Sequence, residues 1–156
     1  APCSPQSISD NYLFGDGDVV TFRIDLCNTG SGNLKTPVTI TDTLGNMIKP
    51  AGGWQVSYSC GGTCTGSAVD ESQYASSKII KFTLTPVGKG LAKTNGIWSF
   101  TFKAQLKAPA PANQPYYRFT NCAKPTTAGI TIPNLCIPAY PFVRAGTPPN
   151  KYEIAP

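Results

Sequence analysis

Residues 19–26 read V-V-T-F-R-I-D-L, and the turn-forming residues C-N-T-G follow them. Side chains alternate along a β-strand, so this stretch has one polar face and one apolar face, the latter carrying Val20, Phe22, Ile24 and Leu26. Residues 36–45 (T-P-V-T-I-T-D-T-L-G) repeat the alternation, and residues 28–33 between them are rich in turn formers. The two stretches are predicted to form a hairpin that opens a β-sandwich.

Four later stretches carry the same alternation, at residues 54–60, 78–85, 97–107 and 116–123. In the longest of them, 97–107, large apolar residues alternate with polar ones. This pattern is typical of a central antiparallel strand with one solvated side. A helical turn is expected only at residues 70–75. The sequence therefore predicts an all-β fold of antiparallel strands.

Length and composition indicate one extracellular domain. The chain has 156 residues, enough for one domain with a sizeable core and too few for a second full domain. Charged residues make up 13%, about half the usual share, and Thr, Ser, Gly and Pro are abundant. The net charge is +5, but the basic residues are scattered singly, so we expect no nucleic-acid partner.

Three features indicate a secreted, extracellular or cell-surface protein. Six cysteines in a chain of this length are typical of an oxidising compartment. No run of roughly 18 apolar residues occurs, so we expect no insertion into a membrane. The sequence begins with Ala1 and Pro2, as a mature chain does after a secretion signal is removed.

The six cysteines are predicted to form three disulfides. The expected pairs are Cys60–Cys64, Cys122–Cys136 and Cys3–Cys27. The first pair encloses two glycines, which let the chain double back, whereas a zinc site would need a matching Cys or His pair. The other four cysteines allow three pairings, which stay open. The nearly symmetrical placement of Cys122 and Cys136 about a turn favours the pairing given.

Both ends of the chain are predicted to be extended arms around one domain. The N-terminal arm is residues 1–14, the sandwich domain 15–127 and the proline-rich C-terminal arm 128–156. Pro133, Pro138 and Pro141 exclude a central strand from the C-terminal arm. Its spaced apolar residues are the candidates for contact with another subunit, and they are Ile130, Ile132, Leu135, Ile137, Tyr140, Phe142, Val143, Tyr152 and Ile154.

The residues that catalysis or metal binding would need are scarce. Without histidine there is no Ser-His or Cys-His nucleophile and no His-bound metal, and the eight acidic residues are spread along the chain. Asp16 and Asp18 are too few for a calcium site and are interpreted as turn residues. Asp42, at an inward position of its strand, is interpreted as a turn cap and not as a perturbed acid. We expect no enzyme activity, no catalytic residue, no metal and no cofactor.

Four segments carry a family resemblance: VVTFRIDLCNTGSG (19–32), VTITDTLG (38–45), WSFTFKAQLK (98–107) and FTNCAKPT (119–126). In this order they resemble the conserved-repeat domain of bacterial and archaeal surface proteins, where an Asn-Thr-Gly strand end precedes a Val-Thr-Asp-Thr-Leu strand and Asn-x-Ala closes the domain. The resemblance implies an immunoglobulin-like sandwich in a surface-exposed structural protein and carries over no catalytic residue. This chain departs from the family in its single copy, its cysteines at 27 and 122, and its C-terminal arm.

The number of predicted strands favours assembly. The six strands are fewer than the roughly seven of an immunoglobulin-like sandwich, so an edge beside the first or sixth strand lacks its neighbour. An arm that fills this edge in its own chain makes a monomer, whereas an arm that fills a neighbour's edge links subunits head to tail. We expect an extracellular, pilus-like homopolymer formed by strand exchange, with the C-terminal arm favoured over residues 1–14.

The alternative function is a carbohydrate-binding or adhesive surface module that acts as a monomer. Exposed aromatic residues would stack on surface glycans, and the candidates are Trp54, Trp98, Tyr116 and Tyr140. The alternation of their strands, however, places Trp54 and Trp98 in the core.

Overall fold

The structure is a computed structural model that describes residues 17–45, 47–107, 119–128, 130–131, 135–139 and 150–154. The predicted N-terminal arm lies outside the described residues. The strands are β1 (Val19–Asn28), β2 (Val38–Thr43), β3 (Ser57–Ser59), β4 (Cys64–Gly66), β5 (Ile79–Pro86), β6 (Gly96–Gln105), β7 (Phe119–Thr127), β8 (Ile130–Thr131), β9 (Leu135–Ala139) and β10 (Asn150–Ile154). The helix α1 (Tyr74–Ser77) overlaps the predicted helical turn.

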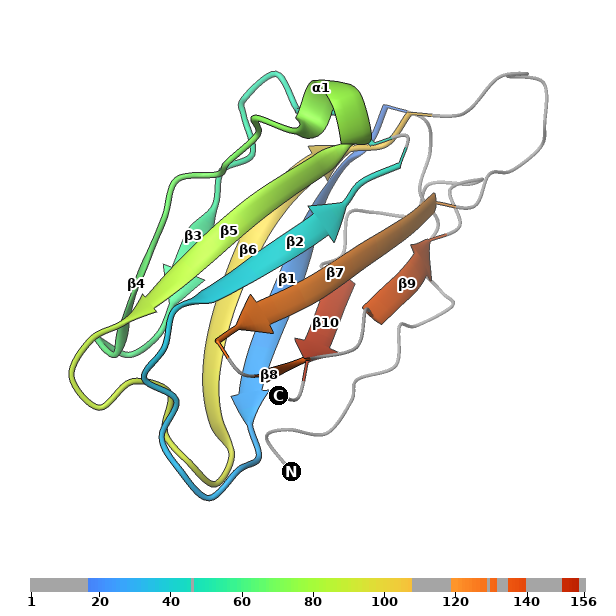
Figure 1. The fold of residues 1–156 in the computed structure, drawn as a ribbon. Helices are drawn as coiled ribbons and strands as arrows, with labels where there is room; N and C mark the ends of the chain where they lie inside the picture. The colour runs from blue at the N-terminus through green and yellow to red at the C-terminus, as the bar shows by residue number, and fades with distance from the viewer. Residues whose placement is uncertain are drawn as a thin grey trace.

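The strands form two sheets that lie face to face as two layers (Figure 1). One sheet has the strand order β10-β1-β6-β3, and the other has the order β4-β5-β2-β7-β8, with β9 also paired to β7. The strand pairs are antiparallel except for β1 with β10, which is parallel. The predicted all-β class is confirmed. Within the described ranges, no helix has the length and apolar character needed to cross a membrane.

The predicted hairpin of β1 with β2 is wrong, because the two strands belong to different sheets. β1 pairs with β6, whereas β2 pairs with β5 and β7. Each strand buries its apolar face, and two facing sheets let these faces pack against each other. The connecting residues 29–37 therefore cross from one layer to the other.

β6 is a central strand, as predicted, and it fixes the four-stranded sheet. It pairs with β1 along the whole length of both strands, and with β3 on its other side. Two further positions extend the β3 side. The backbones of Ile48 and Gln105 exchange hydrogen bonds of 2.9 and 2.8 Å, and the Lys103 N–H donates to the Trp54 carbonyl at 2.6 Å.

Aromatic rings fill the centre of the core between the two sheets. The ring centroid of Phe82 in β5 lies 4.7 Å from that of Phe100 and 4.9 Å from that of Phe102, both in β6. Phe22 of β1 lies 5.4 Å from Phe102 by the same measure. All four side chains are buried, so the alternation in the sequence identified the core faces correctly.

The ends of the predicted strands differ from those in the structure, most clearly for β3 and β7. β3 contains only residues 57–59 of the predicted 54–60, because Gln55 has a φ of +48°, which interrupts an extended backbone. β7 continues past the predicted end at residue 123 to Thr127, since residues 122–126 pair with β2.

Candidate functional site

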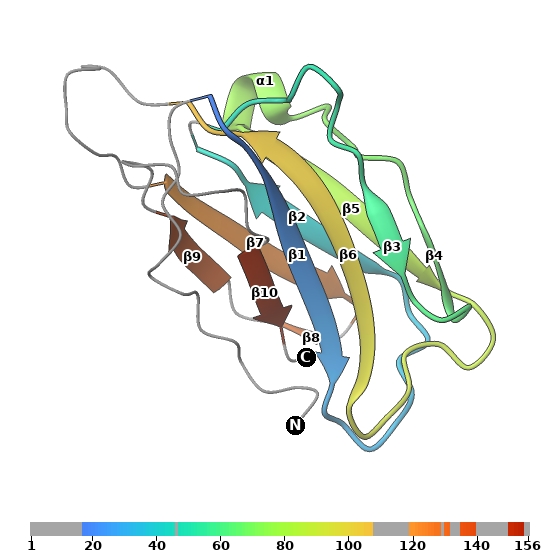
Figure 2. The same ribbon diagram turned by 180° about the vertical axis from the view of Figure 1, so that it is seen from behind.

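The candidate site is the β1 edge, which we define as the side of β1 that faces away from β6. β10 lies beside it and runs parallel to it (Figure 2). The pairing extends from Phe22 level with Asn150 to Leu26 level with Ile154. β1 has 10 residues and β10 has 5, so β10 spans half of the length of β1.

Two further parts of the C-terminal arm lie along β7 of the other sheet. β8 and β9 both pair with β7 in antiparallel directions. Five of the nine predicted contact residues are thereby placed on strands of their own chain: Ile130 in β8, Leu135 and Ile137 in β9, and Tyr152 and Ile154 in β10. The other four lie outside the described residues: Ile132, Tyr140, Phe142 and Val143. Contact of any of the nine residues with a second subunit stays a prediction.

The polar face of β1 carries an ion pair at the edge. Arg23 Nε donates to Asp25 Oδ1 at 2.7 Å, and Arg23 Nη2 lies 3.4 Å from Ser99 Oγ on β6. Asp25 is 5% exposed, whereas the Arg23 side chain is 37% exposed. Along β1, the positive charge of Arg23 therefore comes first and the negative charge of Asp25 follows two residues later.

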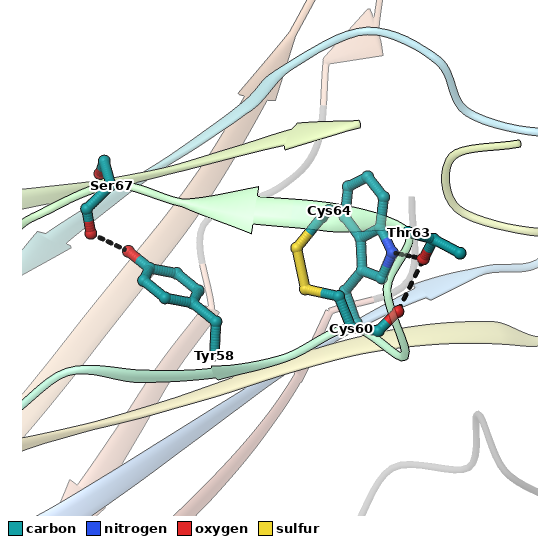
Figure 3. The surroundings of a disulfide bond; sticks show 6 residues. Tyr58, Cys60, Thr63, Cys64 and Ser67 are labelled. Atoms are coloured by element: carbon teal, nitrogen blue, oxygen red, sulfur yellow. Dashed lines mark hydrogen bonds between the residues drawn. A yellow bond between two sulfur atoms is a disulfide. The ribbon is translucent and has the colours of Figure 1, made fainter. Parts of the chain in front are cut away.

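The opposite edge of the same sheet is β3, and a small disulfide loop follows this strand (Figure 3). The predicted bond between Cys60 and Cys64 is present, with a Cα–Cα distance of 5.5 Å. Inside the loop, the Thr63 hydroxyl donates to the Cys60 carbonyl at 2.7 Å and accepts the Trp98 indole N–H at 2.8 Å. The loop is therefore fixed to β6 and leads the chain from β3 into β4 of the other sheet.

The side chain of Tyr58 in β3 lies against Gly66 and Ser67, at the end of β4. Its hydroxyl donates to the carbonyl of Ser67, the residue that follows β4, and Figure 3 shows the Tyr58 side chain pointing toward Ser67. Burial raises the pKa of the Tyr58 hydroxyl, which keeps it protonated as a donor. A side chain on Gly66 would overlap the Tyr58 ring, so this contact requires glycine.

The two tryptophans proposed as sugar platforms are buried. Trp54 is 4% exposed and Trp98 is 1% exposed, which confirms the interpretation that they belong to the core. The Trp54 indole N–H donates to the carboxylate of Glu71, and its ring packs edge-on against Tyr74. The other two candidates, at positions 116 and 140, lie outside the described residues.

The remaining cysteines are consistent with the predicted pairing. Cys27 and Cys122 are both disulfide-bonded. Cys122 is level with Cys136 in the β7–β9 ladder, and opposite positions of antiparallel strands lie within the Cα separation that a disulfide spans. Cys3 lies outside the described residues. The pairs Cys122–Cys136 and Cys3–Cys27 stay predictions.

Asp42 is the most buried acidic residue among those whose burial the structure describes. It is 0% exposed and lies level with Ile80 on one side and Ala123 on the other, which confirms its inward position. It has an interaction partner, and its role as a turn cap stays a prediction. No group of three or more His, Cys, Asp or Glu that could hold a metal occurs in the described part of the chain, and Asp16 lies outside that part.

Asn28 has a structural role that the sequence did not identify. Its amide nitrogen donates to the carbonyls of Gly32 at 2.9 Å and Leu91 at 3.0 Å, and its amide oxygen accepts from the Gly30 N–H at 2.9 Å. Asn28 thus fixes the turn that ends β1 and ties it to a distant loop. The Asn-Thr-Gly sequence was the signal for this turn, but the contact with Leu91 needs the folded chain.

No protein-family model and no curated protein matches this sequence. The resemblance to the conserved-repeat domain of surface proteins therefore stays a prediction.

Proposed function

We propose that the protein is a non-enzymatic, secreted structural protein with an immunoglobulin-like sandwich, and that it is a subunit of an extracellular filament assembled by strand exchange. The observation that carries the proposal is the pairing of residues 150–154 with the β1 edge. A short terminal strand that fits the edge of a regular sheet can occupy the same edge of a neighbour.

The position of β10 in the sequence supports this proposal. Residues 140–149 separate it from β9, and this connection contains Pro141, Pro148 and Pro149. Proline favours stiff, extended backbone, so we expect this sequence to suit a tail that reaches outward. Because the donor strand and the acceptor edge are different segments of the chain, a contact between two subunits leaves one donor and one acceptor unoccupied, and the chain of subunits continues.

The order of the sheet also supports exchange at this edge. β10 is terminal in the order β10-β1-β6-β3, so its removal leaves β1, β6 and β3 joined to one another. The apolar face of β1 remains packed in the core through Phe22, Ile24 and Leu26, all buried. Release of β10 is therefore expected to expose the β1 edge without unfolding the domain.

Electron microscopy and sedimentation velocity of the full-length chain test the proposal. We expect filaments at high concentration, and none from a chain that ends at Pro149. This truncated chain keeps its β1 edge, so a small amount added to full-length protein should cap filament ends and shorten the filaments.

Deletion of residues 1–14 together with Cys27→Ala is the matched control, because it removes the other arm and leaves no free thiol if Cys3 pairs with Cys27. Filaments should survive this deletion if the C-terminal strand is exchanged. A full-length chain that stays a monodisperse monomer at every concentration would contradict the proposed function. Filaments that survive the loss of residues 150–156 but not of residues 1–14 would assign the exchange to the N-terminal arm.

A further inference from the structure

The charges on the two paired strands run in the same order. β10 has the sequence N-K-Y-E-I, in which Lys151 precedes Glu153 by two positions. β1 has Arg23 and then Asp25 at the same spacing. Because the strands are parallel, a positive position on one strand meets a positive position on the other.

The register of the β1–β10 pairing shows which like charges are level with each other. Lys151 is level with Arg23, and Glu153 is level with Asp25. Like charges directly opposite each other on neighbouring strands destabilise the pairing. The repulsion is stronger where a charge is poorly solvated, and Asp25 is 5% exposed. The parallel pairing within one chain is therefore electrostatically mismatched at both charged positions.

Reversal of the direction of β10 removes the conflict. If its middle residue stays level with Ile24, an antiparallel strand brings Lys151 level with Asp25. The same reversal brings Glu153 level with Arg23. Both positions then pair opposite charges, which stabilises neighbouring strands.

The reversal leaves the assignment of the two faces unchanged. Side chains alternate with a period of two, so a strand turned about its middle residue keeps the same residues on the same face. Tyr152 stays level with Ile24, and Asn150 and Ile154 exchange places opposite Phe22 and Leu26. The apolar pattern therefore does not distinguish the two directions, whereas the order of charges does.

We propose that the β1 edge binds residues 150–154 of a second copy of this chain as an antiparallel strand, and that the parallel pairing within one chain is the closed, monomeric form. This inference rests on the proposed strand exchange and adds its direction and its register. Antiparallel ladders are also slightly more stable per residue than parallel ones. The strand of a neighbour is thus the better occupant, and it displaces the chain's own strand.

Exchange of the two charges in the full-length chain tests the direction. The double variant Lys151→Glu, Glu153→Lys keeps the net charge and the composition. It makes the antiparallel pairing repulsive at both positions and the parallel pairing within one chain attractive. We expect the critical concentration for polymerisation, measured by light scattering and sedimentation, to rise by about tenfold.

The matched control removes both charges with Lys151→Gln and Glu153→Gln. Its critical concentration should lie between those of the wild type and the charge-exchanged variant. High salt screens the charges, so it should reduce the differences in critical concentration among the three proteins. If the wild type polymerises and the charge-exchanged variant has an unchanged or lower critical concentration, the antiparallel arrangement is wrong and the proposed filament remains. If the wild type never polymerises, both proposals fail.

A cross-linking measurement tests the register directly. A photoreactive amino acid at position 154 should react with the region of Phe22 in an antiparallel pair and with the region of Leu26 in a parallel one. Trypsin cleaves after Arg23, so the two products fall on different peptides. Mixing isotope-labelled and unlabelled subunits separates cross-links between subunits from those within one. Inter-subunit cross-links at Leu26 would overturn the inference.

Discussion

The four-stranded sheet ends in two edges that are built in different ways. At one edge, β3 has 3 residues, and the Cys60–Cys64 loop leads the chain directly into the other sheet. At the other edge, β1 has 10 residues and its cover, β10, comes from the far end of the sequence. The β3 edge is held partly by contacts between residues close in sequence, such as the Cys60–Cys64 bond, whereas the β1 edge is covered by a distant strand.

Under the proposed strand exchange, this difference favours β1 over β3 as the accepting edge of the four-stranded sheet. A short, interrupted strand is a poor template for an incoming strand, and a long regular strand is a good one. A filament built by strand exchange needs one acceptor and one donor per subunit, because a second acceptor would produce branched or irregular assembly. In the proposed filament, the β1 edge is the side that changes its occupant, and the β3 edge takes no part in the exchange.

The largest expected effect is on the free energy of unfolding, and it compares what β6 and β10, the two neighbours of β1, contribute to stability. Phe22→Ala removes a buried ring that packs against Phe102 of β6, and it should lower the free energy of unfolding by about 3–5 kcal/mol. Deletion of residues 150–156 should lower it by less, because β1 keeps its full ladder with β6. Urea unfolding followed by tryptophan fluorescence measures both.

Thr21→Ala is the control, since this side chain is half-buried on the opposite face of β1, and it should cost less than about 1 kcal/mol. A loss of cooperative unfolding after the deletion of residues 150–156 would contradict the comparison. It would mean that β10 is part of the folding unit and not an exchangeable cover.

A smaller effect is expected at the β3 edge. Gly66→Ala places a methyl group where the Tyr58 ring lies, so the ring must move and its hydrogen bond to Ser67 is lost. We expect a loss of about 1–3 kcal/mol in the free energy of unfolding, measured by urea titration. Gly32→Ala is the matched control, because no atom lies within 4 Å of the added methyl group and the change should be nearly neutral. Equal stability of the two variants would show that the Tyr58 contact does not stabilise this edge.

The sequence predicted what depends on short-range pattern. Alternation identified the core face of β6 and its central position. The two glycines between Cys60 and Cys64 predicted the disulfide loop, and both have positive φ, +59° at Gly61 and +80° at Gly62.

What the sequence could not predict is which strands become neighbours. Alternation gives a strand an apolar face but does not name its partner, so β1 and β2 were paired with each other instead of being placed in facing sheets. For the same reason, the pattern of residues 150–154 fits a sheet edge in either direction. The contact of Asn28, at the end of β1, with Leu91 joins residues that are 63 positions apart, and no local signal marks it.

The smallest expected effect is a pH dependence at the segment that leads into β3. The hydrogen bond from the Trp54 indole, followed by that from Lys49, lowers the pKa of Glu71 below its ordinary value of 4.5. A carboxyl group whose pKa is lower in the folded chain stabilises the fold above its unfolded pKa, and this stabilisation is lost as the pH falls through the folded pKa. Trp54→Phe keeps a ring in the core but removes the N–H donor, so its cost in unfolding free energy should be larger at pH 7 than near pH 3.

The pH-independent part of that cost reports the smaller ring, and the difference between the two pH values reports the hydrogen bond. Glu71→Gln, which cannot ionise, should reduce this difference, and the measurement is urea unfolding of the three variants and the wild type at both pH values. A cost of Trp54→Phe that is the same at both pH values would show that the charged Glu71 does not stabilise the approach to the β3 edge.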